Sequence, residues 1–347
     1  SDVCSSDLSK LVFVSPDSIR PLSQRVRYNS ELQSLDSTVH DYYGMGKGQI
    51  ESLNGRKLHN LGFMGQGMTI AVLDAGFMNV DKIAAFRNLN IKGTHNFVAG
   101  YDNDVYKEMD HGTKTLSTIA MNQPTVFVGT APKADFWLLR TEDYSTESPA
   151  EEDFWIAAVE FSDSVGVDII SSSLGYHGFD DISMNYRYSD LNGRTAAISQ
   201  AASRLASKGI ILVNSAGNDG MGTWKKINVP ADAHDILTVG AVSLDKVNAP
   251  FSSIGPTADG RIKPDVMAYG CPTNVVSGRG YIIPDNGTSF ACPLIAGMVA
   301  CLWQACPNKS AKEILDIVRQ SGNNCQSPDK IGRAHVLTPV TPENLVC

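Results

Sequence analysis

An alternation of short apolar runs with helical patterns, beginning at Met68, constrains the fold of this chain more than any other feature. Such an alternation is typical of a parallel sheet whose strands are joined by helices lying on its faces. The predicted fold class is therefore α/β, with three layers: a mostly parallel central sheet and helices on both of its faces. We expect strands at six runs: 69–73, 136–139, 167–170, 210–213, 237–242 and 265–268.

Local signals predict three helices within this pattern. The first begins at Ser148-Pro149-Ala150-Glu151, which reads as a capping box with proline at the first helical position. It ends near Gly166, where a left-handed C-cap is expected. The second is closed by Gly209, and the third opens at Ser310. The apolar faces of the first two helices are predicted to contain Phe154, Ala158, Phe161 and Val165, and then Ile198, Ala201, Ala202 and Leu205.

Composition and charge exclude several classes of protein. Hydrophobic residues make up 42% of the 347 residues and charged residues 19%, which excludes disorder, collagen-like sequence and coiled coil. A net charge of −8 argues against a nucleic-acid partner, which would favour a basic face. The longest apolar run, 291–303, is shorter than the ~18 residues of a membrane span and contains Pro293 and Gly297. We therefore predict neither a nucleic-acid partner nor a membrane span.

The two ends of the chain differ from the rest. Residues 1–8 and 331–347 both resemble the translation of one sequencing adapter, read on opposite strands, and we expect them to be artefacts. Residues 9 to about 66 lack strong periodicity and end in a stretch rich in glycine. Without the two ends, the seven cysteines become five, at 271, 292, 301, 306 and 325. A Cys306–Cys325 bridge is compatible with the sequence, but the connectivity cannot be deduced from it.

Four polar residues occupy the strand ends and helix starts where an α/β fold places its chemistry. Asp74 ends the run 69–73, where its carboxylate could orient a basic partner, although a lone Asp there more often forms a turn. His111 opens a helical pattern and could exchange a proton near neutral pH, although a lone His is more often a surface residue. Neither residue indicates a catalytic site by itself, and only their combination with other residues does.

Ser289 and Asn218 complete the set. Ser289 precedes a long apolar helix, with Gly287 allowing a tight entry and Pro293 tolerated in the first turn, so its hydroxyl and backbone N–H face the positive helix end. The competing reading is an N-cap serine. Asn218 follows the run 210–213, where its amide could donate to an oxyanion or where it could be a left-handed loop residue.

The order Asp74, His111, Ser289 is one of the three known orders of a serine-protease triad. The chain resembles the subtilisin-like serine proteases over about residues 68–300. Further segments carry the resemblance: Val72 to Gly76, His111-Gly112-Thr113, Ser173-Leu174-Gly175, Ala216-Gly217-Asn218, Phe251-Ser252-Ser253, Gly255-Pro256, Lys263 to Val266, and Gly287-Thr288-Ser289 with Phe290, Ala291 and Pro293.

This resemblance implies a serine endopeptidase acting on polypeptides through an acyl-enzyme. Asp74, His111 and Ser289 would form the catalytic triad, and the Asn218 amide with the Ser289 N–H would form the oxyanion hole. Substrate would pair with two segments of the chain. These contain Ser173, Leu174 and Gly175, and Ala216 and Gly217.

The resemblance also implies a domain plan, with residues 9–55 as a pro-region remnant or linker and 56–330 as the peptidase domain. The chain's own pro-peptide would be a partner, and the protein would be secreted or belong to the cell envelope. No cofactor is required. Structural calcium is familiar in the family, but 102–104 lacks the other ligands of an EF-hand loop. The alternatives are a catalytically silent binding protein of the same fold and an esterase or peptide ligase using the same site.

Two departures from the family pattern stand out. Cys292-Pro293-Leu294 replaces the family's usual Ser or Thr followed by Pro-His, and we expect Cys292 to be a small buried thiol. The segment 140–144 lacks the glycine-bearing edge that many subtilases use to pair with substrate. The sequence therefore does not predict which residues contact the substrate farther from the cleaved bond.

Overall fold

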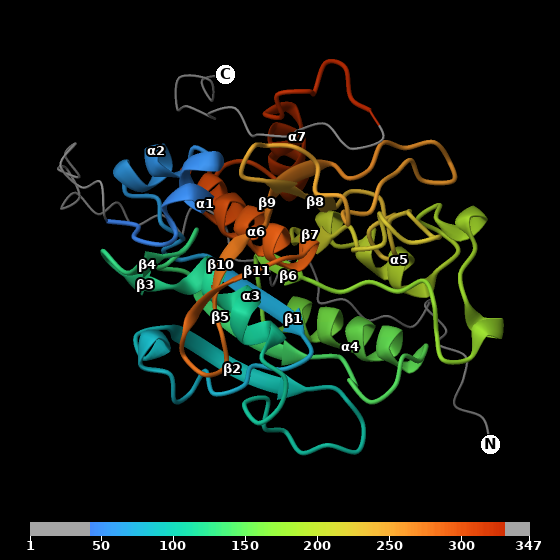
Figure 1. Ribbon diagram of the computed structural model, residues 1–347, viewed down its shortest axis with the longest axis horizontal. Coiled ribbons are helices and arrows are strands. Elements are labelled where there is room, and N and C mark those ends of the chain that lie inside the picture. The colour runs from blue at the N-terminus through green and yellow to red at the C-terminus, as the bar shows by residue number, and fades with distance from the viewer. Residues whose placement is uncertain (1–41, 330–347) are drawn as a thin grey trace.

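The computed structural model describes residues 42–329. A seven-stranded sheet with the order β2-β5-β1-β6-β7-β8-β9 lies at the centre, and every neighbouring pair is parallel (Figure 1). Its strands are β1 (Thr69–Asp74), β2 (Asn90–Asn96), β5 (Asp135–Arg140), β6 (Ile169–Ser172), β7 (Ile211–Ser215), β8 (Leu237–Ser243) and β9 (Val266–Cys271). Two small antiparallel pairs are β3 (Asn122–Gln123) with β4 (Phe127–Val128), and β10 (Thr273–Val276) with β11 (Ile282–Asp285).

Helices cover both faces of the sheet, which confirms the predicted three-layer α/β fold. One core joins the sheet to α3 (His111–Ala120), α6 (Thr288–Ala305), α7 (Ala311–Gln320) and α2 (Gly55–Asn60), with α1 (Lys47–Ser52) beside them. A second core joins the other face to α4 (Ala150–Ser164) and α5 (Ala197–Ala202). The short 3₁₀ helices are η5 (Ala84–Phe86), η6 (Ile182–Met184), η7 (Tyr188–Asp190) and η8 (Ala206–Lys208).

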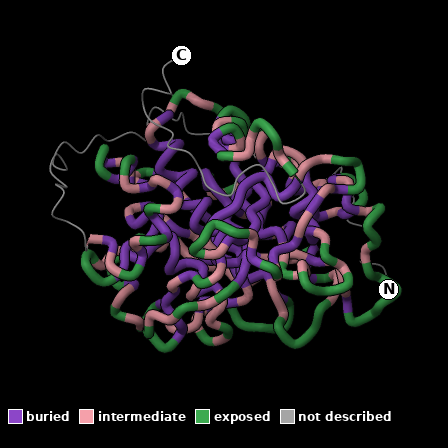
Figure 2. The backbone as a smooth tube through the Cα atoms, turned by 45° about the horizontal axis from the view of Figure 1, so that its top comes forward, coloured by how far each residue is buried: buried purple, intermediate pink, exposed green. Residues whose placement is uncertain are grey.

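The strand β1 shows why the central strands read as continuous apolar runs. Ile70 and Val72 belong to the core on the α6 side, whereas Ala71 and Leu73 belong to the core on the α4 side. Successive side chains of a strand point to opposite faces, so a sheet covered on both faces needs apolar residues at every position. Figure 2 shows this buried interior, with exposed segments around the outline of the molecule and on the surface that faces the viewer.

All six predicted strands exist, with ends that differ by a few residues, but β2 was not predicted. This strand is an edge strand of mixed polar sequence, so its sequence shows neither an apolar run nor a clean alternation. Its pairing with β5 is irregular between Ile91 and Gly93. A side chain at Gly93 would collide with the Trp137 ring, because a Cβ there would lie 2.3 Å from it.

The predicted face of α4 was correct only in part. Ala158 is buried as predicted, and Phe161 and Val165 are partly buried against the same core, but the buried Trp155, Ile156 and Val159 were not predicted. The predicted Phe154 is only partly buried. The predicted capping box is half formed: the Glu151 side chain accepts the Ser148 N–H at 3.1 Å, but no side chain caps the helix start. Gly166 has the expected left-handed conformation, with φ 71°.

The other two helix predictions are confirmed. Ile198, Ala201, Ala202 and Leu205 are all buried, and Gly209 is left-handed with φ 83°. Ser310 caps α7 in a reciprocal capping box with Glu313.

The helix α6 is long and apolar enough to cross a membrane by length and composition, yet 94% of its apolar window is buried inside the protein. It lies beside α3 on one face of the sheet and packs against β6, β7, β8 and β9 (Figure 1). A buried core helix of a soluble protein has the same length and composition. The dense packing around α6 therefore accounts for its apolar sequence.

Part of the segment predicted to be a pro-region remnant packs against the body of the protein. Tyr43 and Ile50 are buried with Val128 of β4, and Leu53 joins the core on the α6 side. The division at residue 55 stays a prediction. Residues 1–8 and 331–347 lie outside the described residues.

Among residues 42–329 the five cysteines are all free, so the Cys306–Cys325 bridge that the sequence allowed is not formed. Cys292 is a buried thiol, as predicted, and burial raises its pKa to about 12. A thiol that holds its proton so strongly is a poor nucleophile.

Candidate active site

Asp74 occupies the last position of β1, in the middle of the sheet, where its side chain is fully buried. Its Oδ1 accepts the Ala75 N–H at 2.8 Å and lies 2.7 Å from His111 Nδ1. Its Oδ2 accepts the Thr115 hydroxyl at 2.9 Å. Both carboxylate oxygens are thus hydrogen-bonded, which holds the side chain in one orientation toward the imidazole.

His111 is the first residue of α3, and it approaches Asp74 because Gly112 has no side chain. The Gly112 N–H donates to Gly76 O at 2.9 Å, and a Cβ at Gly112 would lie 2.4 Å from that oxygen. Burial by itself disfavours the imidazolium, but the neighbouring Asp74 carboxylate outweighs it and the pKa of His111 is raised. A protonated His111 is therefore stabilised in place.

Ser289 is the second residue of α6, at the helix end where free N–H groups meet. Its Oγ donates to Ser173 O at 3.4 Å, and the described residues contain no hydrogen bond between this hydroxyl and the His111 ring. The Phe290 ring lies 5.8 Å from the His111 ring, centre to centre, so the two helix starts adjoin. In ligand-free sites the nucleophile–base contact often tightens only when substrate binds.

Pro293 lies inside α6 rather than in its first turn, which corrects the expectation from the sequence. A proline cannot donate to the carbonyl four residues earlier, here that of Ser289. The Ser173 hydroxyl donates to this carbonyl instead, at 2.8 Å. The helix interruption therefore ties the Ser289 backbone to the segment that follows β6.

Asn218 follows β7, and its side-chain oxygen is already engaged. Asn218 Oδ1 accepts the Thr288 N–H at 2.9 Å and the Thr288 hydroxyl at 3.0 Å. Its amide NH₂ is thereby oriented while it keeps its own hydrogens for another acceptor. The left-handed residue of this turn is Gly217, with φ 107°, and not Asn218. The loop-asparagine reading is thus not supported.

The five residues predicted to bind substrate lie on two neighbouring segments. Ser173 to Gly175 extend beyond β6 and Ala216 with Gly217 beyond β7, and these strands pair in register. Leu174 O accepts the Asn214 side-chain amide at 3.0 Å, which links the two segments. Both segments therefore border the region that contains Ser289 and Asn218.

Three supporting contacts were missed by sequence reasoning. They come from the Thr115 hydroxyl on Asp74, the Ser173 hydroxyl on the Ser289 carbonyl, and Thr288 on Asn218. The spacing offered one signal, because Thr115 lies four residues after His111 and so shares its helix face. Among the described residues no group of three or more His, Cys, Asp or Glu side chains could hold a metal ion.

Residues 65–334 match the family model described as "Peptidase_S8: Subtilase family". Subtilisin NAT from Bacillus subtilis subsp. natto is 29% identical over 283 residues, covering 81% of this chain and 67% of that protein. Subtilisin E from Bacillus subtilis (strain 168) shows the same identity and coverage. A cold adapted subtilisin-like serine proteinase superposes with a TM-score of 0.61 at 20% identity, covering 78% of this chain and 88% of that chain. The self-cleaved protease domain of PatA superposes with a TM-score of 0.59 at 22% sequence identity, covering 77% of this chain and 92% of that chain.

Proposed function

Because the chain belongs to the subtilase family of serine-type endopeptidases, we propose that Asp74, His111 and Ser289 carry out its peptide-bond hydrolysis. The single observation that carries this proposal is the 2.7 Å contact between Asp74 Oδ1 and His111 Nδ1, with the start of α6 beside that ring. A buried carboxylate on one imidazole nitrogen leaves the other nitrogen to accept a proton from a nucleophile.

The proposed reaction follows from these positions. Ser289 Oγ attacks the scissile carbonyl while His111 accepts its proton through Nε2, and His111 then returns that proton to the leaving amine. Water attacks the acyl-enzyme with the same base, and this releases the acid product and regenerates the serine. Asp74 fixes the imidazole tautomer and stabilises the imidazolium throughout. The Asp74 carboxylate raises the pKa of His111, which supports its proposed role in stabilising the imidazolium.

The oxyanion is proposed to bind between the Asn218 amide and the Ser289 N–H. Thr288 supports this role because its two bonds hold the amide group of Asn218 in one orientation. Substrate main chain would lie between the segment of Ser173, Leu174 and Gly175 and the segment of Ala216 and Gly217. Binding through main-chain groups gives affinity without a strict sequence requirement.

The decisive experiment compares the wild-type chain with Ser289→Ala on an unstructured protein substrate, with Ser207→Ala as a matched control at an exposed serine. We expect no measurable peptidase activity in Ser289→Ala, wild-type activity in the control, and an unchanged fold by circular dichroism. Asn218→Ala should lower kcat by about 10²–10³, the loss measured for this kind of donor in a subtilisin. Normal cleavage by Ser289→Ala would refute the assignment.

Two alternatives on the same scaffold are separated by simple assays. A catalytically silent binding protein would not react with a fluorophosphonate, whereas we expect the reagent to label Ser289 in the wild type only. An esterase or peptide ligase would use the same residues, so comparing ester hydrolysis, peptide hydrolysis and ligation of the same acyl group decides among them. The complete hydrogen bonding of Asp74 favours an active site.

The remaining proposals concern the protein around the site. We propose that the protein is secreted or belongs to the cell envelope, and that residues 9–55 include the remnant of a pro-region that assists folding. Efficient refolding of residues 55–330 without added pro-peptide would contradict the second proposal. No cofactor is required by the proposed reaction.

A further inference from the structure

A lysine one helical turn after His111 joins the two parts of the chain that carry the proposed base and nucleophile. Lys114 Nζ lies 3.1 Å from Asp285 Oδ2 and 3.4 Å from Asp110 Oδ1. Asp110 directly precedes His111. Asp285 ends β11, four positions before Ser289. We propose that Lys114 is a positioning residue, which through Asp285 holds the start of α3 against the segment that leads to Ser289. This inference rests on the proposed function. We call Asp110, Lys114 and Asp285 the lysine bridge.

One face of α3 contacts the hairpin of β10 and β11 at three points. The Gly278 N–H donates to Asp110 Oδ2 at 3.0 Å, and the Val276 N–H donates to Ser117 Oγ at 2.9 Å. Lys114 lies between these two contacts, because residues three and four positions apart share a helix face. Its ion pair reaches the end of β11, where the hairpin continues toward α6. The lysine bridge therefore fixes the part of the hairpin that is nearest in sequence to the nucleophile.

The path from Asp285 to Ser289 is short and hydrogen-bonded. The Asn286 N–H donates to Asp285 Oδ1 at 2.8 Å, and the Gly287 N–H donates to a backbone carbonyl of β9 at 2.9 Å. A displacement of Asp285 is therefore passed on to the start of α6. Since the described residues contain no hydrogen bond between the Ser289 hydroxyl and the His111 ring, the spacing of the two depends on contacts around them. A misplacement of about 1 Å can cost a rate about 10²-fold.

Lys114 is charged although its side chain is largely shielded from water. The side chain is 19% exposed, and those of its two carboxylate partners are 33% exposed. Burial lowers the pKa of Lys114, but Asp285 and Asp110 outweigh burial, and the pKa is raised. Salt screens a partly buried pair less than an exposed one. The lysine bridge is therefore suited to hold α3 and β11 together, and an uncharged side chain could not attract both carboxylates.

The lysine bridge also acts on the charge of His111. Burial lowers the pKa of His111 and Asp74 on β1 raises it, while Lys114 lowers it and Asp285 raises it. From α6 the neighbouring group is the uncharged Phe290 ring. Loss of the lysine and loss of its partner on β11 are therefore expected to move this pKa in opposite directions. A contact that only stabilised the fold would not have this effect.

The test compares the wild-type chain with Lys114→Met, Asp285→Asn and the double variant on one peptide substrate. Each rate is divided by the concentration of active enzyme, titrated to completion with a fluorophosphonate, so that unfolded protein is not counted. At about pH 8.5, where an imidazole is ordinarily neutral, we expect each single variant to lower kcat by about tenfold with little change in KM. The double variant should lose about as much as one single variant, because both changes break the same contact.

The pH profile separates positioning of the base from a purely structural role. The acidic limb of kcat/KM reports the pKa of the base in the free enzyme. Because the neutral imidazole is the active form, Lys114→Met should move this limb to higher pH and Asp285→Asn to lower pH. Lys114→Arg keeps the cation and should keep the wild-type limb and most of kcat. The matched control is Lys312→Met on α7, which removes a lysine paired with Asp235 at 3.2 Å and should change neither quantity.

Three results would overturn this inference alone: an unchanged kcat in both single variants, losses that add in the double variant, or limbs that move in the same direction. If Lys114→Met does not fold, Asp285→Asn and Lys114→Arg decide. The inference then requires a lower kcat and a limb at lower pH in the first variant, and values near those of the wild type in the second. If the wild type cleaves no substrate and Ser289 is not labelled, the proposed function fails and the inference fails with it.

Discussion

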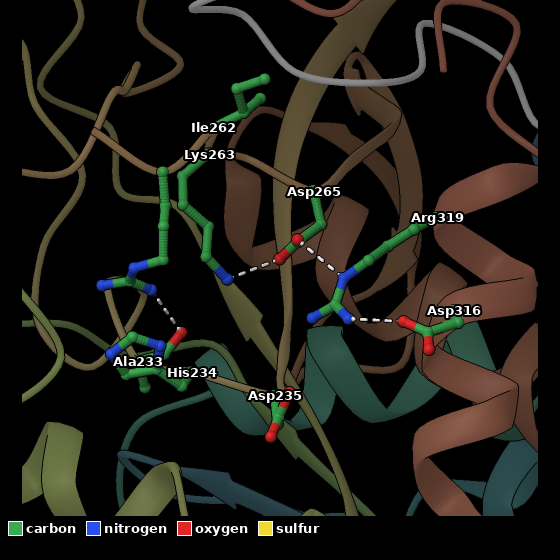
Figure 3. A pocket seen from close by; sticks show the side chains of 9 residues that line it. Ala233, His234, Asp235, Ile262, Lys263, Asp265, Asp316 and Arg319 are labelled. Carbon is green, nitrogen blue, oxygen red and sulfur yellow. Dashed lines mark hydrogen bonds and ion pairs between the residues drawn. The ribbon is translucent and has the colours of Figure 1, made fainter. Parts of the chain in front are cut away.

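Two groups of buried charges in this protein differ in how they are compensated. The paired cluster consists of Lys263, Asp265 and Arg319 and lies between the start of β9 and α7, beside a cavity of about 280 Å³ (Figure 3). The acidic cluster consists of Glu142, Glu151 and Glu152 and lies at the start of α4 and the end of β5. All three residues of the paired cluster are buried or nearly so, whereas in the acidic cluster Glu151 and Glu152 are buried and Glu142 is partly buried. Only the paired cluster contains cations.

In the paired cluster, every ionised group has an opposite charge in contact. Lys263 Nζ lies 2.6 Å from Asp265 Oδ2, and Arg319 Nε lies 3.0 Å from Asp265 Oδ1 (Figure 3). Burial alone would raise the pKa of Asp265, but the two cations hold it at about 2. Burial lowers the pKa of Lys263 to about 8, because Asp265 compensates it only in part. The carboxylate therefore stays ionised at neutral pH.

In the acidic cluster, hydroxyl and backbone N–H donors replace the cations. Glu142 accepts the Tyr176 hydroxyl, Glu152 accepts the Tyr186 hydroxyl at 3.0 Å, and Glu151 accepts two backbone N–H groups. Burial raises the pKa of Glu151 and of Glu152 to about 7, and that of Glu142 well above its ordinary value. Neutral donors thus do not offset the cost of burying a negative charge.

The largest expected effect breaks the paired cluster. Asp265→Asn leaves Lys263 and Arg319 buried without their carboxylate, and we expect a loss of about 3–5 kcal/mol in the free energy of unfolding at pH 7. The pKa of Asp265 is depressed in the folded state, so its contribution is present above the ordinary Asp value and disappears as the pH falls toward about 2. Urea unfolding between pH 7 and pH 2 measures the loss of stability in Asp265→Asn and its pH dependence. These measurements use the Ser289→Ala background, which prevents self-digestion.

The matched control for this prediction is Asp316→Asn. Asp316 also contacts Arg319, at 3.2 Å, but its side chain is 53% exposed. We expect a loss below about 1 kcal/mol, as is usual for solvent-exposed ion pairs. Equal losses in the two variants would show that burial does not set the strength of these contacts.

A smaller effect of opposite sign is expected in the acidic cluster. The pKa of Glu152 is raised in the folded state, so its contribution is present at acid pH and is lost as the pH rises through about 7. Glu152→Gln removes this ionisation, and we expect the variant to be more stable than the wild type at pH 8 by at least about 1 kcal/mol. At pH 5 the difference should vanish or reverse. Asp153→Asn, an exposed neighbour, is the control, and an equal gain there would contradict the explanation.

The smallest effect concerns an ion pair that is not buried at all. Lys107 Nζ lies 2.5 Å from Asp102 Oδ2, and both side chains are more than half exposed. Water and salt screen such a pair, so we expect Lys107→Ala to leave the melting temperature unchanged within measurement error. If Lys107→Ala lowered the stability as much as Asp265→Asn, burial would not explain why the two ion pairs differ.

The sequence predicts the parts of this molecule that depend on local or repeating signals. Buried parallel strands appear as apolar runs, and Gly166, Gly209 and the Ser310 capping box mark helix ends as expected. The edge strand β2 was not predicted, and the buried face of α4 was predicted only in part, because the environment of each is decided by neighbours distant in sequence.

The same limit applies to the site. Residue order and motif context are enough to single out Asp74, His111 and Ser289 as candidates. Helix spacing offers a signal for Thr115, but the Ser173 hydroxyl could not be found in that way, because its bond to the Ser289 carbonyl joins residues 116 positions apart. Such contacts exist only after β6 and α6 have come together.

The place of Ser289 on α6 has a consequence for the timing of synthesis. A ribosome releases β1 and α3 long before it releases α6, which is also the central helix of the core. Under the proposed mechanism, the growing chain carries Asp74 and His111 without a nucleophile until the core helix can fold. A growing chain therefore cannot hydrolyse peptide bonds before the segment of α6 has left the ribosome.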